Sequence, residues 1–484
     1  MGVVTAEPAR MRRSPAPAAP RLSPAERTAR GKSARTAVPR QSHAVFDPPA
    51  GRTDPVDLLE RQARSRVAGL VPVRYGRMME SPFAYYRGAA LPMASDLATT
   101  PVSGLTVQAC GDAHLSNFGV FGSPERRLLF DINDFDETLP GPWEWDVKRL
   151  AASLEVAGRE NGFPGKQRQR IVLAAVARYR EAMREFAAMA NLGVWYARAD
   201  IEELREQFSG ALTPRQRRRV DRGMARARTR DSMQELSKLT EMRNGSPWII
   251  ADPPLIVPIG DLVTGEDGRA VIEQRLQRLL AAYKRTLTTD RKALLDQFAI
   301  ADVARKVVGV GSVGTRCWIV LMLGRDASDP LFLQVKEAEE SVLAAFSGAS
   351  TYPNAGQRVV AGQRLMQAYS DIFLGWQRNA AGLDDNQPHD FYVRQLRDWK
   401  FSLDTSVMIP RGMRQYAALC GWTLARAHAR SGDRIAIAAY LGSADVFDHA
   451  VAEFAAAYAD QNERDYANLV AAVRSGRLTA ERGV

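Results

Sequence analysis

Apolar residues recur at spacings of three and four along most of the chain, which is typical of amphipathic helices that bury one face. The apolar positions are interrupted by charged residues, chiefly Arg and Glu, that would lie on the solvent side of each helix. The pattern predicts helices over residues 55–98, 147–161, 166–191, 213–238, 265–298, 357–368 and 412–433, and one or two more over 445–473.

A different pattern occupies residues 303–336, where β-branched and apolar runs are separated by a Gly-rich turn and then by a polar turn. We expect three consecutive strands there. Two more strands are expected over 370–376 and 390–401, the second leading into a hinge. The apolar run 127–132 follows a Gly-Ser-Pro turn and predicts one further short strand that ends among carboxylates.

Composition limits the class of protein. The chain has 484 residues, of which 45% are hydrophobic and 25% charged, as expected for a globular protein with a sizeable core. No apolar run approaches the ~20 residues that a membrane-spanning helix needs. The three cysteines are far apart and show neither metal-ligand spacing nor a disulfide framework, so we expect a reducing, cytoplasmic setting.

The net charge of +11 is concentrated in two runs. Residues 1–50 hold nine Lys or Arg against three acids, and residues 215–230 hold eight Arg against one Asp. Both runs are compatible with nucleic acid or an anionic surface. No aromatic residues interleave with them for base stacking, which favours a solvated arm and a solvated helix face, and nucleic acid is not the expected partner.

Residues 1–52 are rich in Pro, Ala, Arg and Ser and have almost no large apolar residues, so we expect a disordered tail. Residues 244–260 are rich in Pro and Gly and predict a crossing between two lobes. The expected organisation is a tail (1–52), a helical lobe with the acidic segment (53–245), a crossing with helices (246–300), a Gly-rich sheet lobe (301–402) and helices that complete the helical lobe (403–484).

Acidic and amide side chains gather around the predicted strand 127–132. Clustered carboxylates repel one another unless a cation compensates. An Asp, an Asn five residues later and an Asp beyond a short strand is the arrangement that phosphoryl-transfer enzymes use. We assign Asp112 as the catalytic base, Asn117 and Asp134 as Mg²⁺ ligands, and Asp136 as a second metal ligand or a support for the first. The same cluster contains Asp131 and Glu137.

The Gly-rich turn predicts a binding site for ATP phosphates. Gly309, Gly311 and Gly314 form a G-x-G-x-x-G pattern that includes Ser312. A strand follows it, whereas a dinucleotide-binding unit would continue as a helix, so a hairpin lying over phosphates as in protein kinases is favoured. Lys336, near the end of the third strand, is expected to pair with the α and β phosphates.

Lys336 needs a carboxylate partner, and three acids follow it closely in the sequence. Glu337, Glu339 and Glu340 are the candidates, and we expect Glu340 because a helix could begin there. The backbone of Gln395 and Leu396, at the predicted hinge, is expected to contact the adenine. Within the predicted helical region 55–98, three arginines either contact phosphate or extend over the core with their charged ends in water, and these are Arg74, Arg77 and Arg87.

The segment GDAHLSN resembles the catalytic loop of the aminoglycoside and choline kinases, and INDFDE followed by GPWEWDVKRLA resembles their metal-binding segment and the helix after it. The resemblance implies that Asp112 is the base, that Asn117 and Asp134 bind metal, and that Asp146 braces the loop. Cys110 stands where those kinases usually have His. Most of the chain after residue 50 also resembles a bacterial family named only as domain of unknown function 2252, with no established substrate.

The order of the segments differs from that of the kinase superfamily, in which the Gly-rich sheet comes first. Here the catalytic loop lies near residue 112, the Gly-rich sheet near 310, and the helix expected before the loop near 420. We therefore expect an α+β, two-lobed, protein-kinase-like fold that is circularly permuted, with a small antiparallel sheet lobe and a larger helical lobe. The alternative is that the Gly-rich sheet is unrelated to the loop.

The leading hypothesis is an ATP- and Mg²⁺-dependent phosphotransferase acting on an unidentified hydroxyl acceptor, which could be a metabolite, an antibiotic-like amine alcohol or a protein. Three alternatives stay open. The same site could transfer the nucleotide, as an adenylyltransferase does. It could bind ATP without catalysis, as a pseudokinase does. The acidic cluster alone could serve a metal-dependent phosphoesterase.

Overall fold

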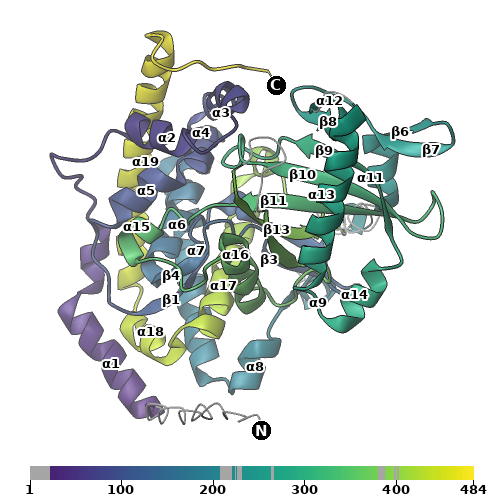
Figure 1. Cartoon of the computed structure of the whole chain (residues 1–484). Coiled ribbons are helices and arrows are strands. Elements are labelled where there is room, and N and C mark those ends of the chain that lie inside the picture. Colours follow the sequence, from purple (N-terminus) through teal and green to yellow (C-terminus); the bar gives the residue numbers. More distant parts are fainter. Residues whose placement is uncertain are drawn as a thin grey trace, which may run out of the picture.

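The computed structural model describes residues 22–207, 218, 221–223, 225, 232–262, 266–379, 387–396, 399 and 403–483. It is a mixed α+β fold with several small antiparallel sheets (Figure 1). The largest sheet has the strand order β12-β13-β11-β10-β9-β8 and is antiparallel throughout. Its strands are β8 (Ile256–Pro258), β9 (Ala299–Lys306), β10 (Cys317–Leu323), β11 (Pro330–Ala338), β12 (Gly375–Asn379) and β13 (His389–Gln395).

Both faces of the central strands are buried. Alternate side chains of β10 point to opposite sides of the sheet, and each side packs against a different helix. Trp318 and Val320 pack on one side with Tyr283 of α13 (Glu266–Lys284), the helix that crosses this face in Figure 1. Ile319 packs on the other side with Leu239 of α11 (Ser232–Leu239). The expected three strands over 303–336 are confirmed, and their turns lie at the edges of a well-packed sheet.

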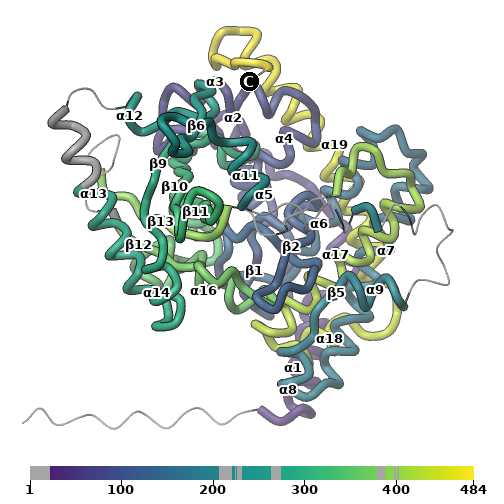
Figure 2. Tube along the Cα trace, turned by 90° about the vertical axis from the view of Figure 1, so that its right-hand side faces the viewer, coloured from purple at the N-terminus to yellow at the C-terminus, as the bar shows by residue number. Residues whose placement is uncertain are grey.

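The helical part is built around four long helices, α6 (Trp143–Glu160), α7 (Gly165–Ala188), α17 (Pro410–Ser431) and α19 (Val446–Arg474). Figure 2 shows α7 and α17 running beside each other. They approach closely because Gly421 of α17 faces the Ala175 carbonyl, where a Cβ would lie only 2.1 Å from the oxygen. Trp143 at the start of α6 stacks on Tyr179 of α7, which ties these two helices into one core.

Shorter elements surround these two parts. The helices are α2 (Pro55–Ala63), α3 (Val71–Met78), α4 (Pro82–Gly88), α5 (Ala90–Leu97), α8 (Asn191–Tyr196), α9 (Ile201–Gln207), α12 (Ile259–Leu262), α14 (Thr289–Leu295), α15 (Ala344–Ser347), α16 (Ala355–Met366) and α18 (Arg434–Leu441). Two small sheets pair β2 (Phe118–Gly122), β3 (Leu128–Ile132) and β5 (Ala199–Asp200), and β1 (Thr106–Ala109) with β4 (Leu139–Pro142). The strand expected over 127–132 is β3, and all its residues are buried.

The expectation of a disordered tail over 1–52 is wrong for its second half. Residues 1–21 lie outside the described residues, but Pro24–Ala37 form helix α1, which packs along α18. Ser23 caps the helix reciprocally with Glu26, and Gly31 lets the two backbones approach. His43 in the following 3₁₀ turn is fully buried and bonds the Tyr440 hydroxyl at 2.7 Å. Small residues are typical of linkers, but in this segment they allow α1 to pack closely against α18.

The segment 244–260, which was expected to cross between two lobes, is part of the sheet structure. Strands β6 (Thr240–Arg243) and β7 (Ser246–Ile249) form a hairpin, and β8 extends the large sheet by pairing with β9. The apolar residues of the segment enter the sheet core, as Ile249 and Ile256 do. The basic run 213–238 lies mostly outside the described residues, apart from the short helix α11.

Within the described part of the chain, no single helix is long and apolar enough to cross a membrane. The pair α18 and α19 passes the same test of length and composition only when both helices are taken together, and they are bent by 85° relative to each other.

Candidate functional site

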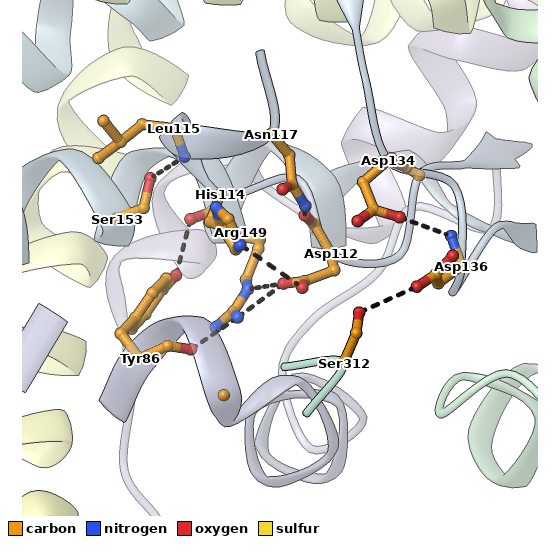
Figure 3. A network of polar contacts seen from close by, with 12 residues as sticks. Tyr86, Asp112, His114, Leu115, Asn117, Asp134, Asp136, Arg149, Ser153 and Ser312 are labelled. Atoms are coloured by element: carbon orange, nitrogen blue, oxygen red, sulfur yellow. Dashed lines mark hydrogen bonds and ion pairs between the residues drawn. The ribbon is translucent and has the colours of Figure 1, made fainter. Parts of the chain in front are cut away.

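One face of helix α6 holds the loop from Cys110 to Asn117 in place (Figure 3). Three polar side chains on this helix, Asp146, Arg149 and Ser153, are spaced by three and four residues and therefore lie on one face. Each bonds a different part of the loop: Asp146 bonds its start, Arg149 its acidic side chain, and Ser153 the Leu115 backbone N–H at 3.0 Å. The loop geometry is thus set by a rigid element.

The brace expected from Asp146 is present. Its carboxylate accepts the backbone N–H groups of Cys110 at 2.6 Å and Gly111 at 2.9 Å. His428 of α17 bonds the same carboxylate through Nε2 at 3.0 Å, and its other ring nitrogen bonds the Tyr179 hydroxyl at 2.8 Å. Cys110 therefore does not need to supply the bond that a histidine at its position could make. His428 is fully buried and supports the loop.

Asp112 is held by an arginine that the sequence reasoning missed. The Arg149 guanidinium donates to Asp112 Oδ1 from Nε at 2.8 Å and lies 2.7 Å from it through Nη2. Nη2 also donates to the Tyr86 carbonyl oxygen at 2.8 Å. Burial alone would lower the pKa of Arg149, but Asp112, Tyr86 and Tyr458 together raise it. The only signal in the sequence was the position of Arg149, one helical turn after Asp146.

The second oxygen of Asp112 faces a histidine at a longer distance. Oδ2 lies 3.7 Å from His114 Nε2. Burial lowers the pKa of His114 to about 4, so the ring is neutral at pH 7. Asp112 therefore has one oxygen fixed by a permanent cation and one that borders the cavity described below.

Asn117 and Asp134 flank Asp112 as expected. The Asn117 side-chain amide donates to the Asp112 carbonyl oxygen at 2.7 Å, which orients its own carbonyl oxygen. Asp134 follows β3 in the turn after the strand, and its Oδ1 accepts the Asp136 backbone N–H at 3.2 Å. The Asp134 side chain keeps 31% exposure, so water and ligands can reach it.

The contact between two distant segments is centred on Asp136. Lys336 of β11 donates to Asp136 Oδ2 in a short ion pair, although the two residues are 200 positions apart in the chain. Lys336 Nζ also lies 3.6 Å from Asp134 Oδ2. The other Asp136 oxygen accepts the Tyr392 hydroxyl at 2.7 Å, and Ser312 Oγ lies 3.3 Å from Oδ2. The Gly-rich sheet and the acidic segment therefore form one site.

Lys336 is charged at neutral pH because of these carboxylates. Its side chain is only 3% exposed, and burial alone would lower its pKa. Asp134 and Asp136 reverse this and raise the pKa of Lys336 well above its ordinary value. Burial and the nearby Asp134 charge in turn raise the pKa of Asp136, against the effect of Lys336.

The expectation that Glu340 pairs with Lys336 is wrong. The ion pairs of Lys336 among the described residues are with Asp134 and Asp136, whereas Glu340 lies beyond the end of β11 and is exposed. Glu337 is no partner either, because it pairs with Arg316 at 3.4 Å and with His389 at 2.8 Å. Successive strand residues point to opposite faces, so Glu337 and Lys336 lie on different sides of the sheet.

Helix α16 contributes a buried arginine near this site, where a carboxylate was sought. Arg358 donates to three backbone carbonyl oxygens, those of Thr138 at 2.6 Å, Asp136 at 2.7 Å and Glu339 at 2.8 Å. It thereby fixes the acidic segment to the chain that leaves β11. Glu137 supports the same junction by accepting the Val342 N–H at 2.7 Å. Burial raises the pKa of Glu137 to about 7.

The Gly-rich turn lies over the acidic cluster. Gly309 and Gly314 have φ values of +66° and +89°, which side chains rarely allow. Arg77 donates to the Gly309 carbonyl oxygen at 2.6 Å. At Gly311 a Cβ would lie 3.2 Å from the Arg87 carbonyl oxygen, so the tip of the turn touches helix α4. Ser312 contacts Asp136, and the turn therefore covers the acidic cluster.

A cavity of about 110 Å³ lies between the turn, the loop and the α2–α4 region. Its wall contains many of the residues expected from the sequence, namely Asp112, Asn117, Asp134, Asp136, Gly309, Gly311, Ser312 and Glu340. Lys336 lies behind Asp136, and Gly314 packs on the side chain of Arg66. The cavity is also lined by Arg66 and Arg87.

Gln395 and Leu396 do not join this cavity. The Gln395 backbone N–H donates to Asp371 at 2.7 Å, and the Leu396 N–H donates to the Phe332 carbonyl oxygen at 2.9 Å. Both N–H groups are therefore already used, which argues against the expected adenine contact. Asp131 is also outside the site, because it forms a buried ion pair with Arg426 at 2.6 Å.

The residues expected to bind Mg²⁺ offer oxygen donors of the right chemistry. Mg²⁺ in nucleotide sites usually takes one or two carboxylates together with phosphate and water oxygens. Asn117, Asp134 and Asp136 border one cavity, and Asp136 is already engaged by Lys336 and Tyr392. In the described part of the structure, no group of three or more His, Cys, Asp or Glu side chains is arranged to hold a metal by itself. Such a site fits a metal that arrives with phosphate.

Comparison with known proteins gives a family and no function. Neither the curated proteins nor the solved structures contain a match to the chain. The family model described as "Uncharacterized protein conserved in bacteria (DUF2252)" matches residues 66–472, which include the loop, the acidic segment and the Gly-rich sheet. The chain therefore belongs to the bacterial DUF2252 family.

Proposed function

We propose that the protein is an ATP- and Mg²⁺-dependent phosphotransferase that acts on a hydroxyl acceptor. The observation that carries the proposal is the position of Lys336, 3.6 Å from Asp134 and ion-paired with Asp136. A Gly-rich turn, a strand lysine and an acidic segment after a loop containing Asp and Asn are the parts that protein-kinase-like enzymes combine. Here two segments supply these parts, residues 110–137 and residues 309–336, and they are distant from each other in the chain.

The order of the segments supports a permuted kinase-like fold within this proposal. The acidic segment precedes the Gly-rich sheet in the chain, and α17, which follows the sheet, supports the loop through His428. The sheet also has the arrangement in which the Gly-rich turn joins β9 to β10 and the lysine lies on the adjacent strand β11. A two-lobed reading would place the nucleotide between this sheet and the helices that carry the loop.

Each residue has a role that follows from its contacts. Asp112 has one oxygen fixed by Arg149, so its second oxygen can accept the proton of an acceptor hydroxyl. Asn117 and Asp134 would hold Mg²⁺, which when bound neutralises phosphate charge. Lys336, anchored by Asp136, would contact the phosphates from the sheet side. Catalysis of this kind consists of positioning and charge stabilisation by preorganised groups.

Nucleotide entry requires the Gly-rich turn to lift. In the present structure Ser312 contacts Asp136, and the cavity of about 110 Å³ is smaller than a nucleotide site of several hundred Å³. The glycines at 309, 311 and 314 suit a turn that changes conformation, because they restrict the backbone least.

The test uses ATP labelled separately at the γ and α phosphates, with Mg²⁺ and a panel of hydroxyl acceptors that includes the protein itself. Phosphotransfer predicts that the γ label enters the product, and that Asp112→Asn removes this transfer while ATP still binds. Transfer of the α label would instead establish an adenylyltransferase. Binding without any transfer by the wild type would leave a pseudokinase. Phosphate release that persists in Lys336→Ala would support a phosphoesterase.

A further inference from the structure

The carboxylates and the arginines of the cavity differ in how they are compensated. Four of the carboxylates have partners: Asp112 has Arg149, Asp134 and Asp136 have Lys336, and Glu137 has the Val342 N–H. The two arginines of the wall, Arg66 and Arg87, form no ion pair with any described residue.

Arg87, in the last turn of α4, is the less compensated of the two. Its guanidinium makes no hydrogen bond to any described residue, and its Nε is buried without a partner. Burial lowers the pKa of Arg87, and Asp112 opposes this more than any other charged group does. A guanidinium remains charged under such conditions. The cavity therefore contains a cation that faces the proposed catalytic base without contacting it.

Arg66, which follows α2, lies further along the same wall. Its residue is 7% exposed, and its Nη1 donates to the Val313 carbonyl oxygen in a short hydrogen bond. Its Nε is buried without a partner. The acidic groups that act most to raise the pKa of Arg66, against the effect of burial, are Glu339, Glu137 and Glu337, and none of them forms an ion pair with it. A buried arginine with an unused donor is costly unless an anion completes it.

The two arginines and Lys336 approach the cavity from different elements. Lys336 lies on the sheet side of the Gly-rich turn, behind Asp136. Arg87 instead belongs to α4, and its backbone touches the tip of the turn at Gly311. Asp112 and Arg87 line the same cavity, so an acceptor whose hydroxyl meets Asp112 would lie beside Arg87.

We propose that Arg87 and Arg66 form an anion subsite for the acceptor, so that the substrate is a small hydroxyl compound carrying a phosphate or a carboxylate close to the hydroxyl. This rests on the proposed phosphotransferase function. Guanidinium groups bind both anions through paired N–H donors, and such a group would satisfy the Nε donors that both arginines leave unused. An amine alcohol would meet the same arginines unfavourably, so antibiotic-like amines are excluded as acceptors by this subsite.

The test measures anion binding by calorimetry with the site filled by ADP and Mg²⁺. The probes are glycerol 3-phosphate, glycerate, inorganic phosphate and uncharged glycerol. We expect the phosphate and carboxylate probes to bind and glycerol not to bind. Arg87→Gln should weaken the binding of the anions about tenfold or more, since one charge-assisted pair is lost, and Arg87→Lys should restore part of it. ADP affinity should change less than about threefold.

Arg64→Gln is the matched control, because Arg64 lies two residues from Arg66 but is exposed to solvent and does not line the cavity. The result for Arg66→Gln is interpreted only if the unfolding midpoint of this variant matches that of the wild type. If the midpoint differs, the Arg87 variants alone decide the test. Weaker ADP binding in Arg87→Gln, with no anion binding beside ADP in the wild type, would assign the arginines to the nucleotide and overturn the acceptor subsite. Anion binding that depends on Arg87 without any ADP binding would support the subsite and overturn the phosphotransferase.

Discussion

Replacement of Lys336 by methionine tests the ion pair that joins the two halves of the site. Methionine keeps an unbranched side chain of similar length and removes only the charge. Asp134 and Asp136 would then face each other without a cation, and Asp136 would keep only its neutral partners Tyr392 and Ser312. The loss of stability should therefore come from uncompensated charge and little from lost packing.

The structure sets the expected magnitude. Removal of one partner from a fully buried ion pair costs about 3–5 kcal/mol. The side chains of Asp134 and Asp136 are 31% and 25% exposed, so water relieves part of the repulsion. We expect Lys336→Met to lower the free energy of unfolding by about 2–3 kcal/mol at pH 7.

The pH dependence has a definite sign. Without Lys336 the pKa of Asp136 in the folded protein rises further above its unfolded value, because burial and Asp134 then act unopposed by a cation. The folded variant consequently binds a proton more tightly than its unfolded chain does, and acid stabilises the variant relative to the wild type. The deficit should be largest at pH 7 and should narrow as the pH falls toward about 4, the ordinary range of an aspartate.

Urea unfolding of the wild type, Lys336→Met, Asp136→Asn and the double variant measures the coupling directly. The double variant should be more stable than the sum of the single losses predicts, by about 1–2 kcal/mol, because it removes both charges together. Losses that add within about 0.5 kcal/mol would refute the ion pair as a link between the segments.

Three further predictions concern the parts that support the site. Asp146→Asn should cost about 2 kcal/mol in urea unfolding, because a carboxylate that accepts two loop N–H groups becomes an amide; an unchanged midpoint would contradict the brace. Burial raises the pKa of Glu144 from 4.5 to about 7, so the folded protein binds this proton more tightly than the unfolded chain does, and the free energy of unfolding falls as the pH rises from 4.5 to 7. Glu144→Gln should flatten the dependence of the free energy of unfolding on pH in that range. An identical slope in the variant and the wild type would refute this assignment to Glu144. Gly31→Val should release α1 to limited proteolysis, since a Cβ there would lie 2.1 Å from the Ala436 carbonyl oxygen; equal cleavage rates would show that the contact is dispensable.

The candidate site could be predicted from the sequence where the chemistry is local. Asp112 and Asn117 share one loop, Asp134 follows one strand, and Lys336 follows one Gly-rich hairpin, so local patterns together with the resemblance to kinases singled them out as candidates. The structure brings these four residues to a common site. The expected hinge residues, Gln395 and Leu396, do not join it. Short-range patterns suffice because strand ends and turns fix where such side chains point.

The partners of these residues could not be predicted, because they come from elsewhere in the chain. Arg149 lies 37 positions after Asp112, and Tyr392 lies 256 positions after Asp136. The partner of Lys336 was sought in the next helix, but the acidic segment supplies it from 200 positions earlier. Pairing at such separation depends on the topology, which periodicity does not encode.

The tail was misjudged for a related reason. Its composition of Ala, Arg and Pro resembles that of a disordered segment, yet α1 is held by contacts with α18 that only the folded partner provides. Gly31 and the buried His43 carry this docking. Single residues of this kind have little weight in composition, although they decide whether a helix can pack.

The central claim is that the acidic segment and the Gly-rich sheet bind one nucleotide together. Thermal unfolding with ATP and Mg²⁺ tests it most directly, with the wild type, Asp134→Asn and Lys336→Ala compared, and Arg64→Gln as the surface control. A ligand at about 100 times its dissociation constant stabilises a protein by about 2.7 kcal/mol. A shared site predicts a Mg²⁺-dependent stabilisation that is lost in both site variants and kept in Arg64→Gln. An ATP-induced stabilisation of equal size in all four proteins would contradict it.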